Sequence, residues 1–213
     1  MPLLWREGKS TRTGTWFCRL GGAALLLAFA LPCPAEVTIQ WPTSLAPERR
    51  TLLTKAVEYV EAHPGVPYRT GGSDATGMDC SGAIVRFLSL VSIEPPRSSQ
   101  GQYEWLRREG RLIAVDPGVK GVEDPVFRAL QPGDLIFWGR MEPPVKGTVR
   151  VTHVHMFLGR EADGHPVMIG ASDGRSYRGR KVRGLGIVDF TVPALGRSPR
   201  ILGFGSPFPK AGS

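Results

Sequence analysis

The chain is predicted to fold as an α+β domain, in which helices come first and an antiparallel β-sheet follows. Apolar residues recur at helical spacing in the first half, whereas short apolar runs separated by turn residues fill the second half. With 213 residues, of which 41% are hydrophobic and 22% charged, the chain is long enough for one domain with a real core. It is too short for two large domains.

Three helices are expected. The first, over residues 48–62, is followed by a His-Pro-Gly sequence that is typical of a helix end. The second begins at Cys80, and the third covers residues 100–108, after a segment in which two prolines stop the preceding element. The predicted strands cover residues 112–115, 135–138, 149–158, 167–171, 184–191 and 200–204.

The N-terminal segment has the outline of a secretory signal. Basic residues precede an apolar run over residues 20–31, which is too short to span a bilayer comfortably, and small residues then allow cleavage near Ala35. The alternatives are an uncleaved anchor or a lipid-modified Cys33. We therefore expect an exported protein of the periplasm or cell envelope, attached to the membrane only if this segment is retained. The expected organisation is a signal peptide over 1–35, an extended leader over 36–47, one domain over 48–205 and a tail over 206–213.

Cleavage of the signal would leave Cys80 as the one remaining thiol, because Cys18 and Cys33 lie within the first 35 residues. A single thiol in an oxidising compartment forms no internal disulfide. It is therefore either buried and inert or retained for its reactivity.

Charge and composition favour some partners over others. The whole chain has a net charge of +8, and the part after residue 35 has about +5, because the first 35 residues contain four basic and one acidic side chain. The basic residues cluster locally over residues 175–183, but no aromatic residues alternate with them as in surfaces that stack bases. We expect no nucleic acid partner, and an acidic cell-wall polymer or lipid headgroups fit better. The chain is expected to be a monomer.

Cys80 lies where a loop rich in Gly, Ser, Thr and Asp becomes a helix. Asp79 is a good N-cap residue, which places the sulfur in the first turn, where free backbone N–H groups favour an anion. We therefore expect a thiol with a lowered pKa. A core cysteine is the simpler alternative, but glycines at 71, 72 and 82 favour a sulfur that a substrate backbone approaches.

A base for such a thiol is present on the strand over 149–158. Because side chains alternate along a strand, His153, His155 and Phe157 share one face, and either imidazole would meet Cys80 if that face turns toward the helix. A His-x-His pair with a cysteine is also a conceivable zinc set. No fourth ligand stands at a convincing spacing, so neither a metal nor another cofactor is expected.

Four sequence blocks resemble the NlpC family of cell-wall cysteine peptidases, and together they span residues 66–172. They are Tyr68-x-x-Gly-Gly, Asp79-Cys80-Ser81-Gly82, Leu130-x-Pro-Gly-Asp-Leu-Ile-Phe-Trp and Thr152-His153-Val154-x-Met-Phe-Leu-Gly.

The resemblance implies a papain-like fold with Cys80 as nucleophile and His153 as general base. It further implies that Tyr68 shapes the oxyanion site and that Asp79 and Ser81 help to hold the substrate. The implied substrate is a peptidoglycan stem peptide, cleaved between D-glutamate and a diamino acid.

The sequence departs from the family pattern at one functional position. A polar residue on the next strand normally orients the catalytic imidazole, and here Gly170 stands in that place. Candidates for the missing third member are Ser172, Asp173 and His155, besides a water molecule held over Gly170. His165, in the turn before this strand, is a further candidate.

Three functions are therefore open. The first is an exported cysteine hydrolase that opens a peptide or amide bond in the cell wall. The second, suggested by Gly170, is a cell-wall-binding module of the same fold with weak or no turnover. The third is hydrolysis of a lipid or a small amide by the same Cys and His pair, since one fold serves many substrates.

Overall fold

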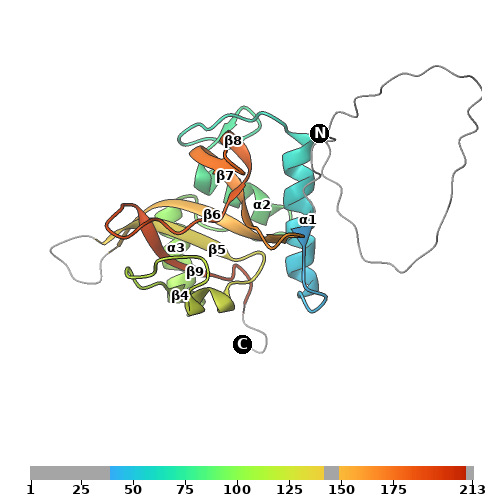
Figure 1. Ribbon diagram of the computed structural model, residues 1–213. Coiled ribbons are helices and arrows are strands. Elements are labelled where there is room, and N and C mark those ends of the chain that lie inside the picture. Colours follow the sequence, from blue (N-terminus) through green and yellow to red (C-terminus); the bar gives the residue numbers. More distant parts are fainter. Residues whose placement is uncertain (1–38, 142–148, 210–213) are drawn as a thin grey trace, which may run out of the picture.

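The structure is a computed structural model that describes residues 39–141 and 149–209. Three α-helices pack on one antiparallel sheet, which confirms the predicted α+β class (Figure 1). The predicted signal segment lies outside the described residues, and so do Cys18 and Cys33. Within the described part of the chain, no helix is long and apolar enough to cross a membrane.

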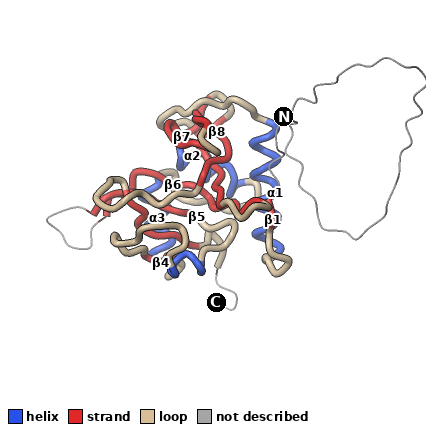
Figure 2. The backbone as a smooth tube through the Cα atoms, viewed as in Figure 1, coloured by secondary structure: helices blue, strands red, loops and turns tan. Residues whose placement is uncertain are grey.

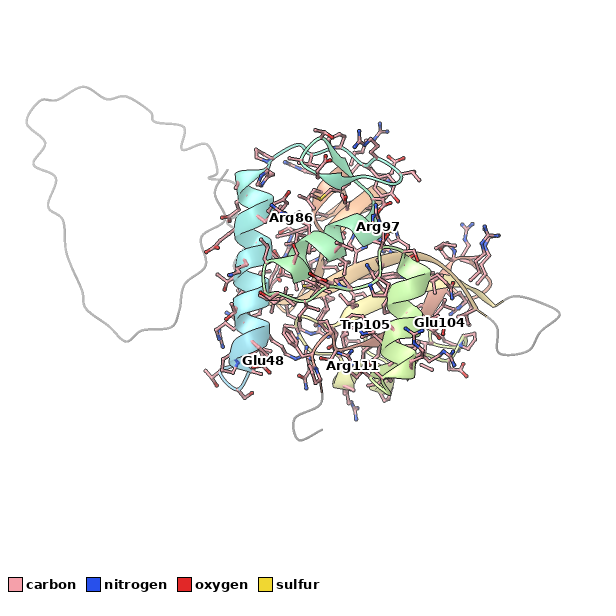
Figure 3. All side chains as sticks on the ribbon, turned by 180° about the vertical axis from the view of Figure 1, so that it is seen from behind. Glu48, Arg86, Arg97, Glu104, Trp105 and Arg111 are labelled. Atoms are coloured by element: carbon pink, nitrogen blue, oxygen red, sulfur yellow. The ribbon has the colours of Figure 1, made fainter. Side chains whose placement is uncertain are left out.

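The helices lie within one residue of their predicted bounds. They are α1 (Pro47–Ala62), α2 (Cys80–Ser89) and α3 (Ser99–Arg108). The Asp79 side chain caps α2 as predicted, because it accepts a hydrogen bond from the backbone N–H of Gly82 at 2.7 Å. All three helices cover the same face of the sheet, which is the near face in Figure 3.

The strands of the main sheet follow the order β4-β9-β5-β6-β7-β8, and β1 adds to β6. Helices and strands form separate layers, as Figure 2 shows by colour. A two-stranded hairpin of β2 and β3 lies in the loop before α2. The strand bounds are β1 (Ile39–Gln40), β2 (Ser73–Asp74), β3 (Gly77–Met78), β4 (Leu112–Ala114), β5 (Leu135–Met141), β6 (Val149–Glu161), β7 (Pro166–Tyr177), β8 (Arg180–Asp189) and β9 (Arg200–Gly205).

The sheet buries both of its faces. One apolar cluster lies between the sheet and the helices, and a second lies on the far face. The second cluster is covered by the short 3-10 helix η1 (Pro125–Ala129) together with Val115 and Val119. The long segment after α3 therefore serves as the cover of this face.

Strands β6 and β7 separate partway along their length, and this separation positions the site. They pair from Arg160 opposite Pro166 as far as Met156 opposite Ile169. Beyond Ile169, β7 continues in register with β8 as far as Tyr177. At Val154, the backbone of β6 therefore has no pairing partner in β7.

Candidate active site

Cys80 is the first residue of α2 and is 5% exposed. The Tyr68 hydroxyl and the backbone N–H of Val154 lie next to its sulfur, and both act to lower the pKa of the thiol. The Val154 contact places the sulfur at the edge of β6 that β7 leaves unpaired. Two predicted site residues, Cys80 and Tyr68, are thus in direct contact, and the sulfur touches the residue that follows His153.

Tyr68 is oriented as a hydrogen-bond donor. It pairs with Met78 through an isolated β-bridge, and the backbone N–H of Cys80 lies near its hydroxyl and acts to lower the pKa of that group. Burial, followed by the charge of Cys80, raises the pKa of Tyr68 to about 12. The hydroxyl therefore keeps its proton at neutral pH, as a group that stabilises an oxyanion must.

The expectation of a lowered thiol pKa is wrong in direction. Burial raises the pKa of Cys80, and the Asp79 charge raises it further. The N–H of Val154 is the largest opposing effect, but it does not reverse the shift. The helix terminus is present as predicted, yet desolvation of the sulfur outweighs it.

The carboxylate of Asp79 is engaged by the protein itself. It accepts N–H groups from Gly71 at 2.8 Å and Gly82 at 2.7 Å, and Arg97 binds both of its oxygens at 3.0 and 3.1 Å. Burial alone would raise the pKa of Asp79, but Arg97 and these N–H groups lower it below its ordinary value. Arg97 also donates to the Ser81 hydroxyl at 3.0 Å. The role of Asp79 and Ser81 in holding substrate stays a prediction, and their observed contacts fix the loop before Cys80.

Arg97 is a site residue that the sequence analysis missed (Figure 3). It lies on the loop between α2 and α3, and it also donates to the Gly72 carbonyl at 2.9 Å. Gly82 serves this same packing, since a Cβ at position 82 would overlap the Gly72 carbonyl oxygen. The glycine at 82 thus lets the loop lie on the helix, which is a structural reason that the sequence could not distinguish from substrate access.

The two histidines of β6 share a face, as predicted, but that face does not turn toward α2. Val154 and Met156 point into the cluster that contains Cys80, whereas Phe157 and Trp138 belong to the cluster on the other face. The ring centroids of His153 and His155 lie 4.6 Å apart, and each lies about 6 Å from the Trp138 ring, at 6.0 and 6.1 Å. The sulfur lies beside the backbone of β6 at Val154, where β6 has no partner in β7.

Both imidazoles are neutral, with His155 fully buried and His153 partly buried. Burial, with a contribution from the charge of Arg175, lowers the pKa of His153 to about 3. The same causes, with the charge of His153, lower the pKa of His155 well below its ordinary value. Since the pKa of Cys80 is raised, the resting state is a neutral thiol beside neutral imidazoles.

These buried histidines predict an acid-sensitive fold. Between pH 6.5 and 3 the unfolded chain protonates His153 and the folded chain does not, so the free energy of unfolding falls as the pH is lowered. The expected slope is about 1.4 kcal/mol per pH unit for each such histidine, or roughly 3 kcal/mol for His153 between pH 6.5 and 4. Urea unfolding at pH 7, 5.5 and 4 measures it. His155→Leu should reduce the slope, and a free energy independent of pH in this window would contradict the neutral assignment.

The candidates for the third member differ in their surroundings. The Ser172 hydroxyl is buried and accepts the backbone N–H of Arg175 at 3.2 Å. Asp173 is exposed and lies opposite Arg183 on β8. His165 bonds Asp189 at 2.8 Å, which gives it a partner of its own in the turn region.

His155 fills the space that a side chain at position 170 would take. A Cβ added to Gly170 would lie 2.8 Å from Cδ2 of the His155 ring. Both ring nitrogens of His155 and Nε2 of His153 are buried without a hydrogen-bond partner among the described residues. Of the candidates, His155 is the one whose ring is adjacent to that of His153.

Within residues 39–141 and 149–209, no group of three or more His, Cys, Asp or Glu side chains is arranged to hold a metal ion. The histidine pair faces an arginine, Arg175, whose guanidinium lies 4.1 Å from the centroid of the Trp138 ring. In the sequence, Arg175 is distinguished only as part of a basic cluster. Its sequence position, beside a glycine in an apparent turn, gave no signal that it would lie at the site.

Comparison with known proteins identifies the family of this chain. The model of the NlpC/P60 family matches residues 65–186, which is more than half of the chain. Comparison with curated proteins found no match.

Three similar solved structures carry the same family name. They are an NlpC/P60 family protein from Bacillus cereus (25% identity, TM-score 0.47, covering 74% of this chain and 40% of that one), the P60 domain of an antigen from M. avium subspecies paratuberculosis (23%, 0.46, 76% and 98%) and the NlpC/p60 domain of the peptidoglycan hydrolase SagA (22%, 0.42, 74% and 97%). The chain thus spans less than half the length of the Bacillus cereus protein. On the match of the family model, which takes in Tyr68, Cys80 and His153, this chain belongs to the NlpC/P60 family.

Proposed function

We propose that this protein is an exported cysteine peptidase that cleaves peptidoglycan stem peptides between D-glutamate and a diamino acid. The observation that carries the proposal is the environment of Cys80, whose sulfur lies at the start of α2 between the Tyr68 hydroxyl and the Val154 N–H. When this sulfur attacks a carbonyl, the carbonyl oxygen becomes an oxyanion. The hydrogen-bond donors that surround the sulfur are then in place to stabilise that oxyanion. Family membership supports peptidoglycan as the substrate.

The neutral resting state favours general-base catalysis over a preformed ion pair. In the proposed first step His153 takes the thiol proton as the Cys80 sulfur attacks the scissile carbonyl. N–H groups of the first turn of α2 and the Tyr68 hydroxyl stabilise the oxyanion. The imidazolium then protonates the leaving amine, and a water molecule, deprotonated by His153, releases the acyl group from sulfur.

His155 is the residue that we assign to orient His153. Neutral imidazoles each offer one N–H and one acceptor nitrogen, so pairing the two rings would satisfy nitrogens that are otherwise buried without a partner. The residue that orients the catalytic imidazole normally lies on the next strand. Here it would be His155, which lies on β6 two residues after the base His153. This arrangement accounts for Gly170, since its lack of a side chain leaves room for the His155 ring.

Export is part of the proposal. It rests on the basic residues and the apolar run that precede Ala35 in the sequence. A peptidase for wall peptides needs to reach the periplasm or cell envelope, where its substrate lies. Fractionation of cells that express the whole chain, with the mass of the processed protein, tests this location and the cleavage near Ala35.

The function is tested by incubating the protein with purified peptidoglycan and identifying the released fragments by mass. Cleavage at the proposed bond leaves D-glutamate with a new carboxylate and the diamino acid with a free amine. Co-sedimentation with the wall and no fragments would support the alternative of a binding module, which the raised pKa of Cys80 favours. Fragments cut at another bond would overturn the proposed specificity and leave the peptidase assignment standing.

A further inference from the structure

Arg175 projects from the part of β7 that pairs with β8 alone. The β7–β8 register shifts between Asp173 and Ser176, and Arg175 lies within this irregularity. Its backbone N–H donates to the buried Ser172 hydroxyl at 3.2 Å, which fixes the strand at this point. The bulge therefore directs the arginine out of the regular alternation and onto the Trp138 ring, 4.1 Å from its centroid.

The guanidinium lies within electrostatic range of His153, His155 and Cys80. Its charge contributes to lowering the pKa of His153 and of His155, and the Cys80 charge acts on Arg175 in turn. Burial lowers the pKa of Arg175 to about 10, which leaves it cationic at neutral pH. A permanent positive charge therefore lies beside the nucleophile and the base.

Arg175 has no acidic partner among the described residues, whereas other arginines of the domain do have one. Arg97 pairs with Asp79 at 3.0 Å, Arg49 with Asp134 at 2.9 Å, and nearby Arg178 with Glu161 at 2.7 Å. A largely desolvated cation without a counter-charge is costly unless something else compensates it. The stacking on Trp138 compensates only part of that cost.

We propose that Arg175 binds a carboxylate of the substrate next to the scissile carbonyl, and so selects acyl donors that carry a negative charge at that point. A guanidinium offers a planar pair of N–H donors that matches a carboxylate. Trp138 holds this fork in one orientation while leaving its N–H edge for the ligand. The carboxylate specificity rests on the proposed function, whereas the anion preference at the sulfur can be tested without any turnover.

The test compares iodoacetate with iodoacetamide as alkylating agents of Cys80 in the whole chain. Both form the same S–CH₂ bond with loss of iodide and of the thiol proton, but only iodoacetate carries a carboxylate. Alkylation is followed on the tryptic peptide 70–86, which separates Cys80 from Cys18 and Cys33. The iodoacetate-to-iodoacetamide rate ratio should exceed that of the urea-unfolded chain by about tenfold, because one nearby cation attracts one of the two reagents.

Arg175→Gln should bring this ratio down to the unfolded value, and Arg175→Lys should give an intermediate ratio. The matched control is Arg180→Gln, an exposed arginine of the same hairpin, which should leave the ratio unchanged. The proposal would be overturned if wild type and Arg175→Gln had the same rate ratio. It would also be overturned if Arg180→Gln lowered the ratio as much as Arg175→Gln does. If the protein cleaves no peptide at all, the ratio still decides whether Arg175 binds a carboxylate.

A second measurement addresses the substrate. On a stem peptide that Cys80 cleaves, replacing the carboxylate nearest the scissile bond by a carboxamide should raise KM at least about tenfold in wild type and leave kcat less affected. In Arg175→Gln the two peptides should have the same KM. A variant that lowers kcat on both peptides equally would assign Arg175 to support of the histidines and overturn the proposed carboxylate contact.

Discussion

Replacing Cys80 by alanine is expected to lower the rate of stem-peptide cleavage by at least about 10⁴-fold, because the acyl intermediate then has no atom on which to form. Folding should survive, since the side chain is small and its loss removes one sulfur from an otherwise intact cluster. Fragment release measured by mass spectrometry, with thermal unfolding in parallel, checks both expectations. Cys80→Ser should also lose most activity, because a hydroxyl is a far weaker nucleophile at neutral pH.

The matched control is Ser89→Ala, at the other end of α2, where an exposed side chain bonds only the Arg86 carbonyl within the described chain. Its cleavage rate should equal that of wild type. Fragment profiles that are the same for wild type and Cys80→Ala would show that the sulfur performs no chemistry. The protein would then be a binding module of the same fold.

The order of helices and strands in the domain could be predicted because residues next to each helix in the sequence indicate where it begins or ends. Asp79 is followed by an apolar stripe, and His63-Pro64-Gly65 ends the first helix, so local signals and tertiary structure agree there. The β7–β8 hairpin was predicted too short. Residues 172–183 contain two glycines and many charged side chains, which are typical of a turn, yet backbone pairing with the opposite strand holds most of them in the sheet.

The site was predictable to the extent that its residues are neighbours in sequence or share a strand face. The loop at Cys80 and the common face of His153 and His155 follow from spacing alone. The contacts of Arg97 and Arg175 do not, because they bridge separate elements and depend on how β6 and β7 diverge. The thiol pKa was predicted in the wrong direction for a related reason, since burial is a tertiary property that a helix terminus does not reveal.

Exchanging the residues at 155 and 170 is expected to move the orienting imidazole from β6 to β7 and to retain activity. His155→Gly alone should lower kcat by roughly 10²- to 10³-fold, because His153 loses the imidazole that lies next to it, and should cost about 2–4 kcal/mol of stability through the cavity that remains. Gly170→His alone should destabilise at least as much, since its Cβ would already meet the His155 ring at 2.8 Å.

The double variant His155→Gly with Gly170→His removes the clash and fills the cavity, because one ring again occupies one space, and it keeps only the backbone strain of a side chain at φ 158°. It should exceed either single variant in kcat by at least about tenfold, a coupling that independent sites would not show. His155→Gly with Gly170→Leu separates positioning from packing: an apolar side chain should recover the free energy of unfolding in urea but not kcat. If His155→Gly with Gly170→Leu recovers kcat as fully as His155→Gly with Gly170→His does, then the His155 ring only fills space. In that case another group must orient His153. Ser172, two residues after Gly170 on β7, is a buried polar side chain that could do so.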